Sequence, residues 1–448
     1  MQEVSVSPRI RGCMSLQRSS DRHHGERRLI EDPNGSPVVM MTNERRRLVV
    51  EGGERIIDFN HKAFKPVPEE GIAMAADAMR RGVMYRYQPP SKEDSLTARF
   101  EKTFAEYMGM KHAIGTNSCG SAMYIALNIA GVEPGDKILT NAFTFHAVPS
   151  VIHHARAEPV LVETNREWGM DAEDLDRKAA ESGAKVLLMS YMRGHVPDMD
   201  AVMEVVEKHD LFFIEDCAHA YCTSWDGRAL GTFGHIGCFS TQSSKGMSAG
   251  EGGIFVTNDD EYAAKAALYA GSYEKLWQKH YGLDADMMDR LQNEIPGYSM
   301  RMHEVTAAML LPQVPRLAVI HDIHVRNHAL LRSIIGEHPN IEIPSPHPKA
   351  GNFHDTMQFH LVGMTTPQAE AFLDVAKEEG LPMQIFGIRR NARDYRSWTY
   401  VDAHRDDLPM TVENIAFAVD LSMQPHLTED NVRVMGQVVL EVLAHVLA

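Results

Sequence analysis

Short apolar runs alternate with helix-like patterns through the middle of the chain, and this alternation constrains the fold most strongly. Candidate strands of this kind are KILTN (137–141), KVLLMS (185–190) and LFFI (211–214), each bounded by charged or polar residues. Between the last two lies the amphipathic stretch DMDAVMEVVEKHD, a predicted helix that Asp198 is expected to cap. Such alternation predicts an α/β fold, with a mostly parallel sheet that carries helices on both faces.

An acid and a lysine lie in the segment from Leu211 to Gly253, beside two of these predicted strands. Asp216 follows the first strand, and Lys245 follows a second apolar segment, 236–240. In open α/β sheets, ligands bind at the carboxyl ends of the strands. An acid and a lysine there are typical of a pyridoxal phosphate site, in which the acid pairs with the pyridinium nitrogen and the lysine holds the aldehyde as a Schiff base.

Other residues at predicted strand ends are compatible with that site. Gly120 and Ser121 precede a predicted helix, and backbone N–H groups at a helix N-terminus bind anions. Strand-to-helix turns in general also favour Ser and Gly, so an ordinary turn is an equal alternative. Phe145, in the loop NAFTFHA, is placed to stack on a flat ring or to fill the core.

Composition excludes several classes of protein. The chain has 448 residues, 44% of them hydrophobic, and a formal net charge of −16, which argues against nucleic acid or an anionic membrane as a partner of the whole molecule. No apolar run has the length of a membrane helix, and the N-terminus lacks the apolar segment of a secretory signal. The five cysteines form no CxxC pair, so we expect neither disulfides nor a metal site, and a cytoplasmic location.

Three regions are predicted along the chain. Residues 1–55 are Arg-rich with little periodicity and read as a mobile extension, with a nucleic-acid-binding arm as the alternative. Residues 56–324 form the predicted large cofactor-binding domain. A long helix beginning near 325 is expected to open a smaller α+β domain, 325–448.

Several motifs in order resemble the sugar aminotransferase (DegT/StrS) family. They are GSAMYIAL, NAFTF, PVLVET, VPDMDAVMEVVEKHDLFFIEDCAHA, GCFSTQSSKGMSAGEGGIFVTND and GYSMRMHEVTAAML. The resemblance covers about residues 65 to 320, and the C-terminal region only in outline. It implies the type I aminotransferase fold and the cofactor pyridoxal 5'-phosphate.

The resemblance also assigns roles to individual residues. Lys245 resembles the Schiff-base lysine, and Asp216 resembles the acid that keeps the pyridine nitrogen protonated. His219 stands where the family has Gln or His near the phenolic oxygen of the cofactor. Phe145 matches the stacking aromatic, and the expected phosphate contacts are Gly120, Ser121 and Ser240.

The chain departs from the family pattern in two places. Where G-x-N-x-R-M is common, Ser299 replaces the Asn and Arg301 is kept, so either residue is a candidate to complete the phosphate site across a dimer. The loop SYMRGHVPDMD is closer to members that aminate keto-cyclitols of the inosose type. The candidate substrate residues are Tyr85, Arg193, His195 and Arg389, and Arg389, Arg390 and Arg393 are candidates for the donor carboxylate.

The resemblance predicts a homodimeric aminotransferase with shared active sites and ping-pong chemistry. Glutamate or glutamine is the expected donor, and a keto-sugar or keto-cyclitol the expected acceptor. A pyridoxamine-dependent sugar dehydratase is one alternative, but such relatives replace the lysine. A non-catalytic regulatory or binding protein is another, and it would be expected to lack Asp216 or Lys245, both of which are present.

Overall fold

The computed structural model describes residues 29–31, 37–39, 46–352, 355–388 and 390–448. The chain divides into two units, Met1–Arg47 and Leu48–Ala448. Within the first unit, strand β1 (Leu29–Glu31) pairs antiparallel with β2 (Pro37–Val39). The second unit contains every element discussed below. The boundaries predicted at residues 55 and 324 remain predictions.

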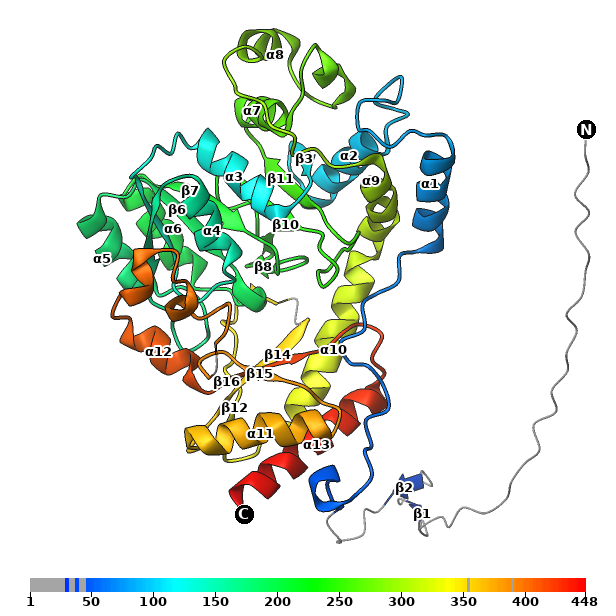
Figure 1. The fold of residues 1–448 in the computed structure, drawn as a ribbon, viewed down its shortest axis with the longest axis vertical. Coiled ribbons are helices and arrows are strands. Elements are labelled where there is room, and N and C mark those ends of the chain that lie inside the picture. The colour runs from blue at the N-terminus through cyan, green and yellow to red at the C-terminus, as the bar shows by residue number, and fades with distance from the viewer. Residues whose placement is uncertain (1–28, 32–36, 40–45, 353–354, 389) are drawn as a thin grey trace, which may run out of the picture. The chain divides into compact units, whose positions relative to one another are not determined.

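A seven-stranded sheet forms the larger part of the second unit (Figure 1). Its strands are parallel except for β11, which runs antiparallel to both of its neighbours, so the predicted mostly parallel sheet is confirmed. In sheet order the strands are β3 (His112–Thr116), β11 (Gly253–Thr257), β10 (Ile236–Ser240), β7 (Phe212–Asp216), β6 (Val186–Ser190), β4 (Lys137–Asn141) and β5 (Glu158–Val162).

Helices cover both faces of this sheet. Alternate residues of β6 enter opposite cores: Leu187 packs with helices α2, α5 and α6, whereas Leu188 packs with α3, α4 and α7. Alternation of this kind follows from the two-residue period of a strand, and apolar side chains on both faces mark a fully covered sheet. The helices of this part are α1 (Glu69–Arg80), α2 (Leu96–Met108), α3 (Cys119–Ile129), α4 (Ala147–His154), α5 (Ala172–Ser182), α6 (Met199–Lys208), α7 (Asp260–Ala270), α8 (Ala285–Leu291) and α9 (Glu304–Leu310).

Side-chain caps fix where several helices begin. The predicted cap Asp198 accepts hydrogen bonds from the backbone N–H groups at the start of α6. Ser118 caps α3 in the same way, accepting from the N–H of Ser121 at 3.0 Å. Because Ser118 follows β3 closely, this cap sets the N-terminus of α3 beside the carboxyl end of that strand.

The C-terminal part contains a four-stranded antiparallel sheet with its own apolar core. Its strands, in sheet order, are β12 (Ile341–Glu342), β14 (Thr356–Leu361), β16 (Ala418–Ser422) and β15 (Gln384–Ile385). Its core is completed by α10 (Leu317–Ile335), α11 (Thr366–Glu378) and α13 (Glu429–Leu447).

Two predicted boundaries differ from the structure. Helix α10 begins at Leu317 rather than near residue 325, because Leu317 is buried in the core of the seven-stranded sheet and extends the helix towards it. Figure 1 shows α10 running from the side of α9 towards α13. Strand β7 continues to Asp216, two residues beyond the apolar run. Its pairing with β6 and β10 holds these polar residues in the sheet.

The remaining elements are short. A three-stranded sheet has the order β13 (Ala350–Gly351), β8 (Ser224–Trp225), β9 (Arg228–Ala229). Helix α12 spans Pro409–Ala416, and the 3₁₀ turns are η1 (Val49–Glu51), η2 (Met192–Gly194), η3 (Leu276–Lys279), η4 (Leu311–Arg316), η5 (Tyr395–Ser397) and η6 (Asp402–Arg405).

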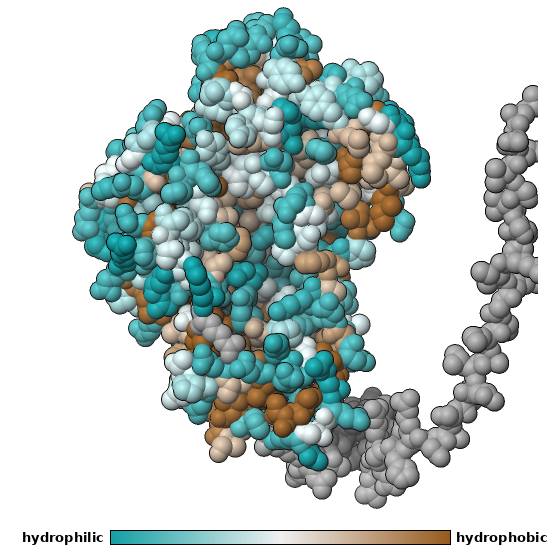
Figure 2. All heavy atoms as spheres, viewed as in Figure 1, coloured by the Kyte–Doolittle hydropathy of each residue, from teal (hydrophilic) through white to brown (hydrophobic). Residues whose placement is uncertain are grey.

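The face of the molecule seen in Figure 2 is mainly hydrophilic, with scattered apolar areas. Exposed apolar side chains include Ile72 and Met79 on α1, and the aromatic residues Tyr273 and Tyr298. None of the helices in the described part of the chain is both long enough and apolar enough to cross a membrane.

Candidate functional site

A cavity of about 410 Å³ opens at the carboxyl ends of β6, β7 and β10. Strands β7 and β10 are adjacent and parallel, with Asp216 paired to Cys238, so Asp216 and Ser240 emerge at the same edge of the sheet. The cavity brings together most of the site residues predicted from the sequence, namely Gly120, Phe145, Arg193, Asp216, His219, Ser240 and Lys245.

The Asp216 carboxylate lies buried at the end of β7. Its oxygens accept hydrogen bonds from the Ser190 hydroxyl at 2.7 Å and from the N–H of Ala218 at 3.1 Å. Burial raises the pKa of Asp216, while these donors and the charge of Lys245 oppose the rise. A carboxylate held in this way can form an ion pair with a protonated ring nitrogen that enters the cavity.

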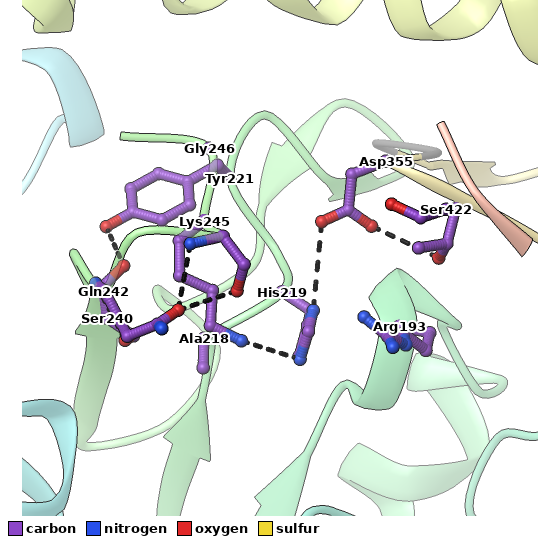
Figure 3. A network of polar contacts seen from close by, with 12 residues as sticks. Arg193, Ala218, His219, Tyr221, Ser240, Gln242, Lys245, Gly246, Asp355 and Ser422 are labelled. Carbon is purple, nitrogen blue, oxygen red and sulfur yellow. Dashed lines mark hydrogen bonds and ion pairs between the residues drawn. The ribbon is translucent and has the colours of Figure 1, made fainter. Parts of the chain in front are cut away.

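Lys245 and His219 meet in the same cavity. The Lys245 Nζ atom lies 2.8 Å from His219 Nε2, as Figure 3 shows. Burial, followed by the charge of Arg193, lowers the pKa of Lys245 to about 8. Burial, followed by the charge of Lys245, lowers the pKa of His219 to about 3. A lysine with a lowered pKa supplies more free amine near neutral pH, which is the form that attacks a carbonyl.

A second lysine fixes the loop that carries Lys245. Lys65 Nζ donates to the backbone carbonyls of Lys245 at 2.8 Å and of Gly246 at 2.6 Å. Gly246 is packed closely, since a Cβ atom there would lie 2.9 Å from the ring of Tyr221. The backbone of Lys245 is therefore held by Lys65 and by the close packing of Gly246, and its side chain is held by His219.

The glycine-rich segment after Lys245 brings β11 against the start of α3. A Cβ atom on Gly253 would lie 2.2 Å from the carbonyl oxygen of Ser118, so no larger residue fits there. Gly120, in the first turn of α3, lines the cavity. Ser121 lines a neighbouring cavity that Ser118 and Gly120 also border, and its hydroxyl donates to Asn117 at 2.6 Å. The N-terminus of α3 thus presents positive potential to the cavity.

Phe145 and two arginines form another wall of the cavity. The Phe145 ring is 39% exposed, and the Arg393 guanidinium lies 5.6 Å from its centre. Burial, followed by the charge of Arg193, lowers the pKa of Arg393 to about 10. Among the described residues, the buried Nε atoms of both Arg193 and Arg393 lack a hydrogen-bond partner. Arg193 also pairs with Asp420, and the open Nε donors of the two guanidinium groups make this wall suited to an anion.

The other predicted substrate residues lie apart from this arrangement. His195 Nε2 is 3.0 Å from Gln358 Oε1 and lines a second cavity, of about 390 Å³, which Arg193 also borders. The Tyr85 hydroxyl is 3.3 Å from that of Tyr273. Arg389 lies outside the described residues.

Ser299 and Arg301 interact with each other. Arg301 donates to the Ser299 hydroxyl at 3.1 Å and to the carbonyl of Gly271 at 2.9 Å. Both residues lie at a shallow surface pocket with Tyr273 and Tyr298. The choice between Ser299 and Arg301 as a contact across a dimer remains a prediction.

Sequence reasoning missed two charged residues near this site, Lys65 and Asp355. Asp355 is buried just before β14, and its Oδ2 atom lies 3.9 Å from His219 Nδ1. Burial acts to raise the pKa of Asp355, but His219, Arg193 and His324 together lower it. Neither residue belongs to a recognisable motif, and both come from segments far from Lys245 in the sequence. Only the folded chain brings them to the site.

Comparison with known proteins identifies the family. The model of the "DegT/DnrJ/EryC1/StrS aminotransferase family" matches residues 90–439. The chain belongs to this family. Its members depend on pyridoxal phosphate, in agreement with the resemblance found in the sequence.

Similar curated proteins include one named for polysaccharide biosynthesis, one for GDP-perosamine synthesis and one for inosose amination. The chain is 34% identical to the spore coat polysaccharide biosynthesis protein SpsC of Bacillus subtilis over 222 residues, which is 49% of this chain and 56% of that protein. It is also 34% identical to GDP-perosamine synthase of Caulobacter vibrioides over 219 residues, again 49% of this chain and 56% of that protein. The chain is 29% identical to L-glutamine:2-deoxy-scyllo-inosose aminotransferase of Streptomyces lividus over 293 residues, which is 65% of this chain and 68% of that protein.

Solved structures share the fold. The crystal structure of 3-amino-5-hydroxybenzoic acid synthase superposes with a TM-score of 0.73 at 24% identity, covering 86% of this chain and 100% of the other. An aminotransferase from Psychrobacter cryohalolentis superposes with a TM-score of 0.75 at 21% identity, with the same coverage. The type I aminotransferase fold predicted from the sequence is confirmed.

Proposed function

We propose that this protein is a pyridoxal phosphate-dependent aminotransferase that transfers an amino group from glutamate or glutamine to a keto-sugar or keto-cyclitol. The observation that carries the proposal is the presence, in one cavity, of a buried carboxylate at a strand end and a lysine of lowered pKa. Retention of Lys245 argues against a dehydratase, and retention of both Lys245 and Asp216 argues against a non-catalytic relative.

The residues of the cavity fit the cofactor. Asp216 faces the space where a pyridine nitrogen is expected, and the Phe145 ring offers a stacking surface. The N-terminus of α3 with Gly120, together with Ser240, offers donors to a phosphate. When bound, pyridoxal phosphate supplies an aldehyde that captures amines and a ring that withdraws electrons.

In this proposal each side chain has one task. Asp216 holds a proton on the ring nitrogen by favouring the ion pair. With the cofactor bound, Lys245 would be the amine that holds it and the general base and acid that moves a proton at the substrate carbon. His219 would hold the free amine of Lys245 in place, through the 2.8 Å contact.

The substrates are proposed from charge and from the relatives. Arg193 and Arg393, with open buried donors on the cavity wall, are suited to the carboxylate of the amino donor. Relatives named for inosose amination support a keto-cyclitol as one acceptor class, and GDP-perosamine synthase supports a nucleotide keto-sugar as the other. We propose a homodimer as the working form, since Tyr273 and Tyr298 are exposed beside Arg301. A cytoplasmic location completes the proposal.

Spectroscopy of the purified protein tests the proposal. Added pyridoxal phosphate is expected to develop a visible absorption band, and borohydride is expected to fix the cofactor on Lys245, as peptide mass spectrometry would show. Glutamate or glutamine should then bleach the band, and inososes or nucleotide keto-sugars should restore it. Protein that binds no cofactor would refute the enzyme assignment, whereas turnover of amino acid pairs alone would refute the acceptor class.

A further inference from the structure

The imidazole of His219 lies between two charged groups that come from different parts of the chain. On one side Nε2 is 2.8 Å from the amine of Lys245, in the loop after β10. On the other side Nδ1 faces Asp355, at the start of β14, with 3.9 Å between Nδ1 and Oδ2. The Nδ1 atom is buried and has no hydrogen-bond partner among the described residues. Figure 3 shows the three side chains in a row.

The contact with Lys245 favours one of the two neutral forms of the ring. The pKa of Lys245, about 8, keeps most of its amine protonated at neutral pH, and an ammonium group can only donate. The pKa of His219, about 3, keeps the ring neutral, and a neutral imidazole has one donor nitrogen and one acceptor nitrogen. Nε2 is therefore the acceptor, and the single ring proton lies on Nδ1.

The opposite side of the ring leads to the same tautomer. The pKa of Asp355 is held low by His219, Arg193 and His324 against the effect of burial, so its carboxylate is ionised. A carboxylate 3.9 Å from Nδ1 attracts an N–H group there and repels a bare lone pair. The positive charge of Arg193 lowers the pKa of both His219 and Lys245. It disfavours a protonated imidazole, but it does not favour one neutral tautomer of His219 over the other.

We propose that Asp355 is a positioning residue that fixes His219 as the Nδ1–H tautomer, so that the Nε2 lone pair holds the amine of Lys245 in the cavity. The inference rests on the proposed function only in treating Lys245 as the reacting amine. It makes the antiparallel C-terminal sheet a part of the site, because Asp355 directly precedes β14 and its neighbour Thr356 pairs with Ser422 of β16. The two tautomers differ only in which ring nitrogen carries the proton, and the position of that proton can be measured directly.

Nitrogen NMR of the cofactor-free protein, labelled with ¹⁵N-histidine, measures the tautomer. The His219→Gln variant assigns the signal of His219 among the 23 histidines of the chain. We expect a pyrrole-type shift for Nδ1 and a pyridine-type shift for Nε2 at neutral pH. The reverse pattern in the unaltered protein would overturn the proposal, and this measurement does not depend on any variant folding.

The Asp355→Asn variant changes the partner of Nδ1 at nearly constant volume. Its neutral amide attracts an N–H group at Nδ1 less strongly than a carboxylate does, so we expect part of the population to shift to the Nε2–H form and the contact with Lys245 to weaken. Loss of the carboxylate also removes a charge that raises the pKa of Lys245. Competitive acetylation followed by mass spectrometry should then show Lys245 reacting about twofold faster at pH 7.

Asp420→Asn is the matched control. Asp420 is also buried in the C-terminal sheet, and its carboxylate accepts from Arg193, Gln358 and Gln384 rather than facing His219. The His219 tautomer should be unchanged in this variant. If Asp355→Asn also left the tautomer unchanged, Asp355 would not be the positioning group. Failure to bind pyridoxal phosphate would refute the proposed function alone, because every measurement here uses cofactor-free protein.

Discussion

Two buried clusters of charged groups in this molecule are built in opposite ways. In the first, both terminal nitrogens of Arg86 donate to the Glu101 carboxylate, at 2.6 and 2.8 Å, and His280 lies 2.6 Å from Arg86. In the second, Lys245 contacts the neutral ring of His219 rather than a carboxylate. Asp355 stands 3.9 Å beyond that ring.

The difference separates a stabilising cluster from one suited to chemistry. Burial acts to raise the pKa of Glu101, but the charges of Arg86 and then His280 outweigh it and lower this pKa to about 2, so the ion pair persists over the whole neutral range. Among the described residues, Lys245 has no carboxylate partner at contact distance, and burial lowers its pKa to about 8. Direct pairing of opposite charges fixes protonation states, whereas separation of the charges leaves an amine that can gain or lose a proton near neutral pH.

The largest expected effect follows from removing the amine of the second cluster. Lys245→Arg keeps a positive charge but cannot serve as base or nucleophile at neutral pH. We expect transamination to fall by about 10⁴-fold, equal to about 5.5 kcal/mol in the barrier. The melting temperature should change little. Steady-state turnover with glutamate measures the loss, and near-normal activity in this variant would contradict the assigned role.

Breaking the first cluster should instead affect folding. Arg86→Met leaves the Glu101 carboxylate buried without its cation, at an expected cost of about 3–5 kcal/mol in the free energy of unfolding. Urea denaturation measures this cost. The double variant Arg86→Met/Glu101→Gln should recover part of it, because the stranded charge is gone. A single variant as stable as the unaltered protein would show that the pair adds nothing to stability.

The pH dependence of stability distinguishes the clusters further. The pKa of Glu101 is lowered from 4.5 to about 2 by folding, so its contribution is complete above pH 4.5 and is lost as the pH falls towards 2. We expect the free energy of unfolding to fall through this window in the unaltered protein. In Glu101→Gln this part of the slope should be absent, and an unchanged slope would assign it to other carboxyl groups.

The smallest expected effect is at the rim of the cavity. Phe145→Leu keeps an apolar contact but removes the aromatic face, which is worth about 0.5–1.5 kcal/mol in ring stacking. Binding of pyridoxal phosphate should weaken by about two- to thirteenfold, with no change in melting temperature. Absorption titration measures this, and unchanged affinity would place Phe145 outside the stacking role.

Local patterns in the sequence predicted much of the fold and part of the site. Strand periodicity and caps such as Asp198 predicted the parallel sheet, because these signals depend on neighbours in the chain. Where tertiary packing decided, prediction failed: the start of α10 is set by burial of Leu317 in a distant core. The approach of Lys65 to the carbonyls of the Lys245 loop has no local signal either.

The sequence by itself determined that Asp216 and Lys245 would follow strands of one sheet, because parallel strands end at a common edge. Only the tertiary structure decided which groups complete the site. Asp355 follows Lys245 by more than a hundred residues and reaches His219 because the C-terminal sheet folds back against the end of β7. Contacts between segments so distant are fixed by packing and by buried charge, which no local pattern of residues encodes.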